Sequence, residues 1–178
     1  MSMIKNIEID GKQVAFKASA AIPRIYRMKF QRDIYKDLKA LEKSIGDNNE
    51  ESSNLDMFSL EMFENIAFVM AKHADASIPN TPEEWLDGFN TFSIYQVLPQ
   101  LIELWGLNVQ TDVEAKKLRP TEREMTTPLF LLRCVQLGLS MADLELLSIG
   151  LINNMYAESR NDDCKYAQLA TQEDFDRF

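Results

Sequence analysis

The sequence predicts a mainly α-helical protein in which an N-terminal β-hairpin precedes the helices and a flexible linker separates two parts. Polarity alternates over residues 3–17, apolar residues recur at steps of three and four over most of the remaining chain, and residues 108–125 are polar with mixed charge. We therefore expect a hairpin-plus-helical domain at 1–107, a linker at 108–125 and a small all-α domain at 126–178.

The hairpin is predicted from an Asp10-Gly11 pair between two alternating runs. These two residue types tolerate the positive φ angles that a type I′ turn requires, and the turn joins strands that carry an apolar residue at every second position. A lone hairpin is marginal in water, so its apolar face must pack on the helices of the same chain. The apolar positions are Ile7, Ile9, Val14 and Phe16.

Four helices are expected in the remainder of the first part. Thr81 and Glu84 form a capping box around Pro82, which suits the first turn because it has no N–H to lose. Gly106 is expected to end the last helix, which Pro99 bends or breaks. The predicted ranges are 22–45, 55–75, 82–90 and 92–105.

The second part begins with a compact apolar helix that Thr127-Pro128 opens and Gly138 ends. Ser140 with Asp143 is expected to cap a following helix over 141–159. Thr171 with Asp174 is the start of a final turn that places Phe175 and Phe178 on one face. This acidic, aromatic tail either folds back on its own domain or docks on a partner.

Charge and composition exclude several kinds of partner. The formal net charge of −9 offers phosphates no attractive field, so we expect neither nucleic acid nor an anionic membrane as a partner. Apolar runs fall short of the ~20 residues that span a bilayer, and the N-terminus lacks the apolar core of a signal peptide. Cys134 and Cys164 lack a metal-binding or disulfide spacing, which predicts a reducing cytoplasm.

The sequence predicts neither an enzyme nor a metal or cofactor site. His73 is the single histidine, and no nucleophile elbow, glycine-rich phosphate loop or metal motif accompanies it. A histidine near a helix C-terminus is explained by the helix dipole. Cys134 lies within LFLLRCVQL, where it reads as a small core residue. The enzyme alternative predicts a pocket that converges on His73 or Cys134.

A helix-turn-helix is the alternative for residues 129–155, since they contain a helix, a glycine turn and a second capped helix. Residues 141–153 would then be the recognition helix in a major groove of DNA. This segment contains Asp143 and Glu145 but no lysine or arginine, and DNA is read by basic and amide side chains. Two packed helices explain the pattern better than a DNA-binding regulator.

Two helices of the first part carry more apolar residues than one core-facing stripe needs. Core packing is the plain explanation, but methionine and aromatic side chains also form adaptable binding faces. We therefore predict a partner-binding or self-association surface over these two helices. Its residues are Phe58, Met62, Phe63 and Phe68 on the first helix, and Phe92, Tyr95, Leu98 and Trp105 on the second.

Four long strings resemble one known family. AIPRIYRMKFQRDIYKDL and PEEWLDGFNTFSIYQVLPQLIELW are similar to the N-terminal portion of tail assembly chaperones from phages and prophages of Gram-positive bacteria. TTPLFLLRCVQLGLSMADLELLSIGLINNMYAESRNDD and ATQEDFDRF resemble the downstream part of the family's long form. Together they span residues 21–38, 82–105, 126–163 and 170–178, about half of the chain.

The resemblance implies a non-enzymatic role in virion assembly within the host cytoplasm. In this family a ribosomal frameshift extends a short form into a long form, and Lys116-Lys117 is what a slippery site would encode. The N-terminal domain would coat the tape measure protein, and the C-terminal domain would recruit major tail tube subunits through Tyr156, Phe175 and Phe178. Self-association and pairing with the short form are further expectations, and the protein would be absent from the mature virion.

Overall fold

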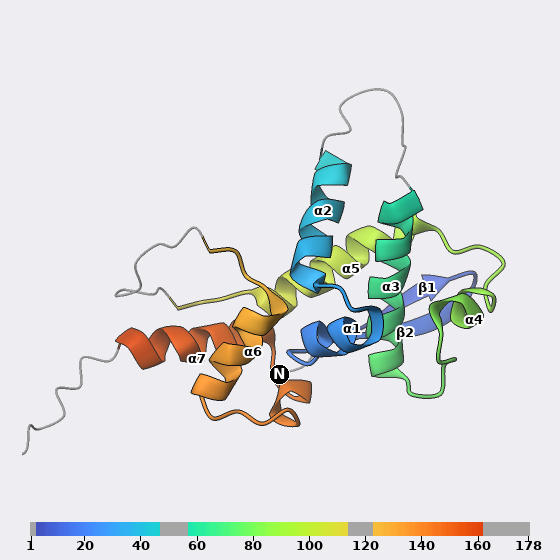
Figure 1. Ribbon diagram of the computed structural model, residues 1–178. Helices are drawn as coiled ribbons and strands as arrows, with labels where there is room; N and C mark the ends of the chain where they lie inside the picture. Colours follow the sequence, from blue (N-terminus) through green and yellow to red (C-terminus); the bar gives the residue numbers. More distant parts are fainter. Residues whose placement is uncertain (1–2, 47–56, 114–122, 162–178) are drawn as a thin grey trace, which may run out of the picture.

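The computed structural model describes residues 3–46, 57–113 and 123–161, and shows a mainly α-helical chain with an N-terminal hairpin (Figure 1). This confirms the predicted fold class. The elements are β1 (Met3–Ile9), β2 (Lys12–Ala18), α1 (Ile22–Phe30), α2 (Ile34–Gly46), α3 (Met57–Ala74), α4 (Pro82–Leu86), α5 (Ile94–Val109), α6 (Thr127–Gln136), the 3-10 turn η1 (Asp143–Glu145) and α7 (Ile149–Asn161).

The hairpin forms as predicted. β1 and β2 pair in antiparallel register from Met3–Ala18 to Ile9–Lys12, and a two-residue turn joins them. Asp10 and Gly11 both have positive φ, at 51° and 71°, as the type I′ turn requires.

The single helix predicted over 22–45 is wrong, because the structure divides it into α1 and α2. Gln31 ends α1 in the left-handed region at φ 57°, and its N–H donates to the Arg27 carbonyl. Asp33 then caps α2, since its Oδ1 accepts from the Tyr35 N–H at 3.2 Å. The apolar period continues across this break, so periodicity alone could not locate it.

Other helix boundaries also differ from prediction, and α4 ends at Leu86 instead of residue 90. α5 passes through Gly106 and ends at Val109, because the buried Asn108 anchors the last turn. The helix predicted over 141–159 begins only at Ile149. Ser140 and Asp143 make the expected hydrogen bonds, at 2.7 Å, but they close the short η1 turn instead of a long helix. In the caps of α4 and α6, the Thr81 and Thr126 hydroxyl oxygens accept from the backbone N–H groups of Glu84 and Leu129.

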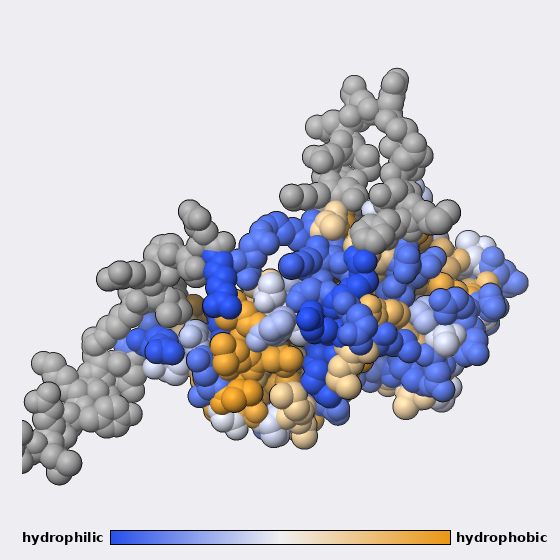
Figure 2. All heavy atoms as spheres, in the orientation of Figure 1, coloured by the Kyte–Doolittle hydropathy of each residue, from blue (hydrophilic) through white to orange (hydrophobic). Residues whose placement is uncertain are grey.

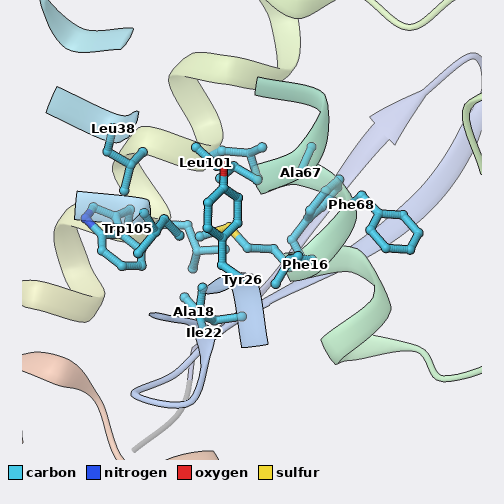
Figure 3. Close-up of a cluster of buried hydrophobic side chains, with 14 of the residues drawn as sticks. Phe16, Ala18, Ile22, Tyr26, Leu38, Ala67, Phe68, Leu101 and Trp105 are labelled. Atoms are coloured by element: carbon cyan, nitrogen blue, oxygen red, sulfur yellow. The ribbon is translucent and has the colours of Figure 1, made fainter. Parts of the chain in front are cut away.

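α3 and α5 pack against the hairpin and enclose the main core, whose side chains come from the hairpin, α1, α2, α3 and α5 (Figures 1 and 3). Trp85 on α4 extends it through edge-on contacts with Phe16 and Phe68. Tyr26 is fully buried at its centre and donates its hydroxyl to Asp37 Oδ2 at 2.7 Å. The labelled core residues in Figure 3 are Phe16, Ala18, Ile22, Tyr26, Leu38, Ala67, Phe68, Leu101 and Trp105.

The described C-terminal helices share this core. α6 contacts α1, and α7 contacts α5, while Phe130 and Ile152 belong to the same buried cluster as the hairpin residues. The predicted linker spans residues 108–125. Asn108 and Val109 are helical, and residues 114–122 of that linker lie outside the described residues.

Candidate protein-interaction surface

Most of the surface predicted over the second and fourth helices lies in the core instead. Met62, Phe63 and Phe68 on α3 are at most 2% exposed, and Leu98 and Trp105 on α5 are also buried. Their apolar excess has a structural cause, because the hairpin, α1, α2 and α5 surround α3. In this fold these five side chains are unavailable to a partner. The side chain of Phe58 lies outside the described residues.

The other two described residues of that set, Phe92 and Tyr95, differ in how far they are exposed to solvent. Phe92 is half-buried and packs with Phe63, Trp85 and Phe89 at ring-centroid distances of 5.4–5.7 Å. Tyr95 is 65% exposed at the start of α5. Of the predicted N-terminal residues whose side chains are described, Tyr95 alone presents most of its area to solvent.

Tyr156, predicted for the C-terminal partner, is half-buried on α7. The guanidinium groups of Arg133 and Arg160 lie over its ring, at 4.7 and 5.4 Å from the centroid. Arg133 also donates to Asn153 Oδ1 at 3.3 Å, which ties α6 to α7. Phe175 and Phe178 lie outside the described residues, so the paired aromatic tail stays a prediction.

The structure instead exposes apolar side chains on the C-terminal helices. Six of the eleven large apolar side chains that are exposed among the described residues fall between positions 132 and 155. Figure 2 shows an orange area over α6 and the loop below it. We call these six residues the α6–α7 apolar surface: Leu132, Val135, Met141, Leu146, Leu151 and Met155.

The α6–α7 apolar surface arises because α6 is apolar on both faces, whereas among the described residues only one face is covered. Thr127, Phe130 and Cys134 share the face that is buried against the body. Leu132 and Val135 lie outside this face and are 49% and 60% exposed. A helix that is apolar all round normally belongs in an interior, and contiguous exposed apolar area marks interaction sites. The run LFLLRCVQL carries this signal in the sequence, where core packing alone also explains it.

The loop between α6 and α7 extends the same surface. Gly138 has φ 75°, which reverses the chain directly after α6. The exposed large apolar side chains of this loop, Met141 and Leu146, are 40% and 69% exposed. Leu144 between them is fully buried and anchors the loop. The exposed apolar residues are thus held in place by buried ones.

Hydrogen bonds fix this segment to the N-terminal part. Asp33 Oδ2 accepts from the Thr127 N–H at 2.9 Å, so one carboxylate serves the first turns of both α2 and α6. The Asn108 amide donates to the Ser19 carbonyl and accepts from the Ile149 N–H, each at 3.3 Å. These hydrogen bonds therefore hold the helices that carry the α6–α7 apolar surface against the N-terminal part.

His73 lies at the edge of a small pocket between α1 and α3. Its Nε2 is 2.9 Å from the Ser19 hydroxyl, and burial, with Lys17 nearby, lowers the pKa of the imidazole to about 4. The ring is therefore neutral at pH 7. Ser19 is fully buried, so its hydroxyl has no open approach for a substrate, and the pair links the residue after β2 to α3. The pocket of about 290 Å³ is lined by Ile25, Lys29, Phe68, Val69, Lys72, His73 and Asn80.

Cys134 is fully buried on the inner face of α6, and burial raises the pKa of its thiol to about 11. It is protonated at neutral pH and packs as a small apolar residue. Within the described ranges, no cluster of His, Cys, Asp or Glu has the arrangement of a metal site. No helix in that same part of the chain is both long and apolar enough to cross a bilayer.

Comparison with models of known protein families, with curated proteins and with solved structures found no match. Function is therefore inferred from the α6–α7 apolar surface and from the sequence resemblance.

Proposed function

We propose that this chain is a non-enzymatic assembly adaptor of the phage tail assembly chaperone type. The observation that carries the proposal is the α6–α7 apolar surface, which hydrogen bonds fix to the N-terminal part and which is exposed to solvent. Water disfavours such a surface, and it gains free energy when a partner covers it. We assign it to the major tail tube subunit, in keeping with the role that the resemblance implies for the C-terminal part.

The tape measure protein is proposed as the partner of the N-terminal part. Five of the residues predicted for that contact are buried, so the contact must use other exposed residues, among which Tyr95 remains a candidate. The acidic surface supports a chaperone that must stay soluble in the host cytoplasm while it offers apolar area.

The test is co-expression with the tail tube and tape measure proteins, using an affinity tag on the full-length chain. Leu146→Glu places a charge on the α6–α7 apolar surface at a position that is 69% exposed. Met28→Glu is the matched control, because Met28 is 67% exposed on α1 and is not one of the six defining residues. We expect L146E to lose the tube subunit and keep the tape measure protein, and M28E to keep both.

Full-length variants are preferred to a truncation at residue 108. Removing the C-terminal part would delete Phe130 and Ile152 from the core and expose the side chains that they cover. It would also leave the Asn108 amide without its partner on α7. Retention of the tube subunit by L146E would reject the assigned surface. If the unaltered chain captures neither protein, the adaptor proposal itself fails.

A further inference from the structure

β2 is an edge strand with an open outer side. A two-residue turn closes on the hydrogen-bonded pair Ile9–Lys12, so the backbone bonds to β1 come from alternate residues of β2 beginning at Lys12. The backbone N–H and C=O groups of Gln13, Ala15 and Lys17 therefore point away from β1. Across the described residues, these groups have no hydrogen-bond partner. Such an edge is a template for another strand.

A groove runs directly along this edge. Its volume is about 300 Å³, and residues 12–15 of β2 form one wall, while the end of α3, the following loop and α4 form the rest. Trp85 is nearly buried, and Ile78 and Phe89 are half-buried, so the groove offers apolar area beside the open backbone groups. This combination of unpaired edge and side-chain pocket is what recognition by strand addition requires.

The charges around the groove select its occupant. Asp75 and Glu84 line it and are both exposed. The one lysine in the lining, Lys12, is already engaged: its ammonium donates to the Gly88 carbonyl at 2.6 Å and lies 5.5 Å from the centre of the Phe89 ring. Among its described lining residues, the groove thus presents two exposed carboxylates and no free cation.

We propose that β2 binds an extended partner peptide that adds a third strand, with an aromatic side chain in the groove and a lysine or arginine two residues to each side. Alternate residues of a strand face the same way, so this spacing directs all three side chains toward the groove. The site is separate from the α6–α7 apolar surface and does not depend on the function assigned to it. The acidic segment ATQEDFDRF of this chain has the wrong charge for the groove.

The other edge of the hairpin provides the matched control. Asn6 on β1 faces Ala15 across the ladder, so both have outward-pointing N–H groups. The hollow beside β1 is polar, and its lining is Glu8, Asp10, Gly11, Gln96 and Gln100. Proline is tolerated at such edge positions, where it deletes an outward N–H without breaking the pairing of the strands.

The probe is a fluorescein-labelled peptide of sequence Thr-Lys-Thr-Phe-Thr-Lys-Thr, titrated into the full chain and followed by anisotropy and amide NMR. We expect saturable binding below about 1 mM, with shifts at Gln13, Ala15 and Lys17. Ala15→Pro should weaken binding about tenfold, whereas Asn6→Pro should not change it. Circular dichroism confirms that each variant is folded.

A second pair of variants tests the charge of the groove. Glu84→Lys should weaken peptide binding, while Glu83→Lys, in the same helical turn but outside the groove lining, should not. Absence of binding at about 1 mM, or equal binding by A15P and N6P, would overturn the proposal. Concentration-dependent self-association that A15P abolishes would instead assign the edge to a second copy and would also overturn it.

Discussion

α3 and α6 are both strongly apolar helices, but α3 is buried in the core whereas one side of α6 is exposed to solvent. Along α3, residues from Met62 to Ala71 are buried except Glu64, because other elements cover the helix from several sides. Along α6, Phe130 and Cys134 are buried while Leu132 and Val135 are exposed. The number of neighbours, more than apolar content, decides which helix offers a binding surface.

The largest expected effect comes from a large-to-small change on α3. Phe63→Ala removes a ring that is 1% exposed and packs against Phe92, so it should lower the free energy of unfolding by about 3–5 kcal/mol. Urea denaturation monitored by circular dichroism measures this. A change below about 0.5 kcal/mol would mean that α3 is not sealed as described and would restore Phe63 as a surface residue.

The next effect tests how firmly the C-terminal helices are attached. A Cβ on Gly150 would lie 1.8 Å from the Gln110 carbonyl oxygen, so Gly150→Ala must separate α7 from the end of α5. We expect a loss of about 1–3 kcal/mol. Gly106→Ala is the control within α5, where a Cβ meets nothing within 4 Å and should stabilise the helix by about 0.5–1 kcal/mol. Equal effects would show that the two parts do not pack as described.

The pH dependence of the free energy of unfolding tests the burial of α3 at the His73–Ser19 contact. The folded pKa of His73, about 4, lies below the ordinary value of 6.5, so the unfolded chain binds the proton more readily between these values. The contribution of His73 to the free energy of unfolding is therefore fully present above pH 6.5. It falls as pH drops toward 4, by about 1–3 kcal/mol after allowance for partial solvent access.

Urea unfolding at a series of pH values compares the unaltered chain with His73→Gln. Because His73 is the only histidine, the difference between the two slopes isolates its contribution from that of the carboxylates. Parallel slopes between pH 6.5 and 5 would contradict the buried neutral imidazole.

Local signals in the sequence were sufficient for the hairpin and for several helix starts. Asp10-Gly11 specifies its turn through backbone sterics alone, and Thr81 caps α4 through a side chain three residues from its target. Such features need no knowledge of the rest of the fold. The break between α1 and α2 was missed because the apolar period of three and four residues continues across it.

The burial of five residues predicted for a partner surface could not be foreseen for a related reason. Phe68 and Leu132 both sit in apolar helical runs, and no local rule distinguishes them. Phe68 lies against Trp85 across the core, whereas Leu132 has no element over it in the described chain. Tertiary neighbours decide exposure, and a single sequence does not list them.

The smallest expected change in stability is the most informative about function. Leu132→Glu with Val135→Glu alters two side chains on the outer face of α6, so the free energy of unfolding should change by less than about 0.5 kcal/mol. Binding of the dye ANS, which reports exposed apolar area, should fall at the same time, because the α6–α7 apolar surface then carries two charges. A loss of several kcal/mol would show that α6 is covered on both faces, as α3 is. Natural chains seldom expose an apolar face that folding does not need. If the double variant keeps its free energy of unfolding but loses ANS binding, this side of α6 is not required for folding and is available to a partner.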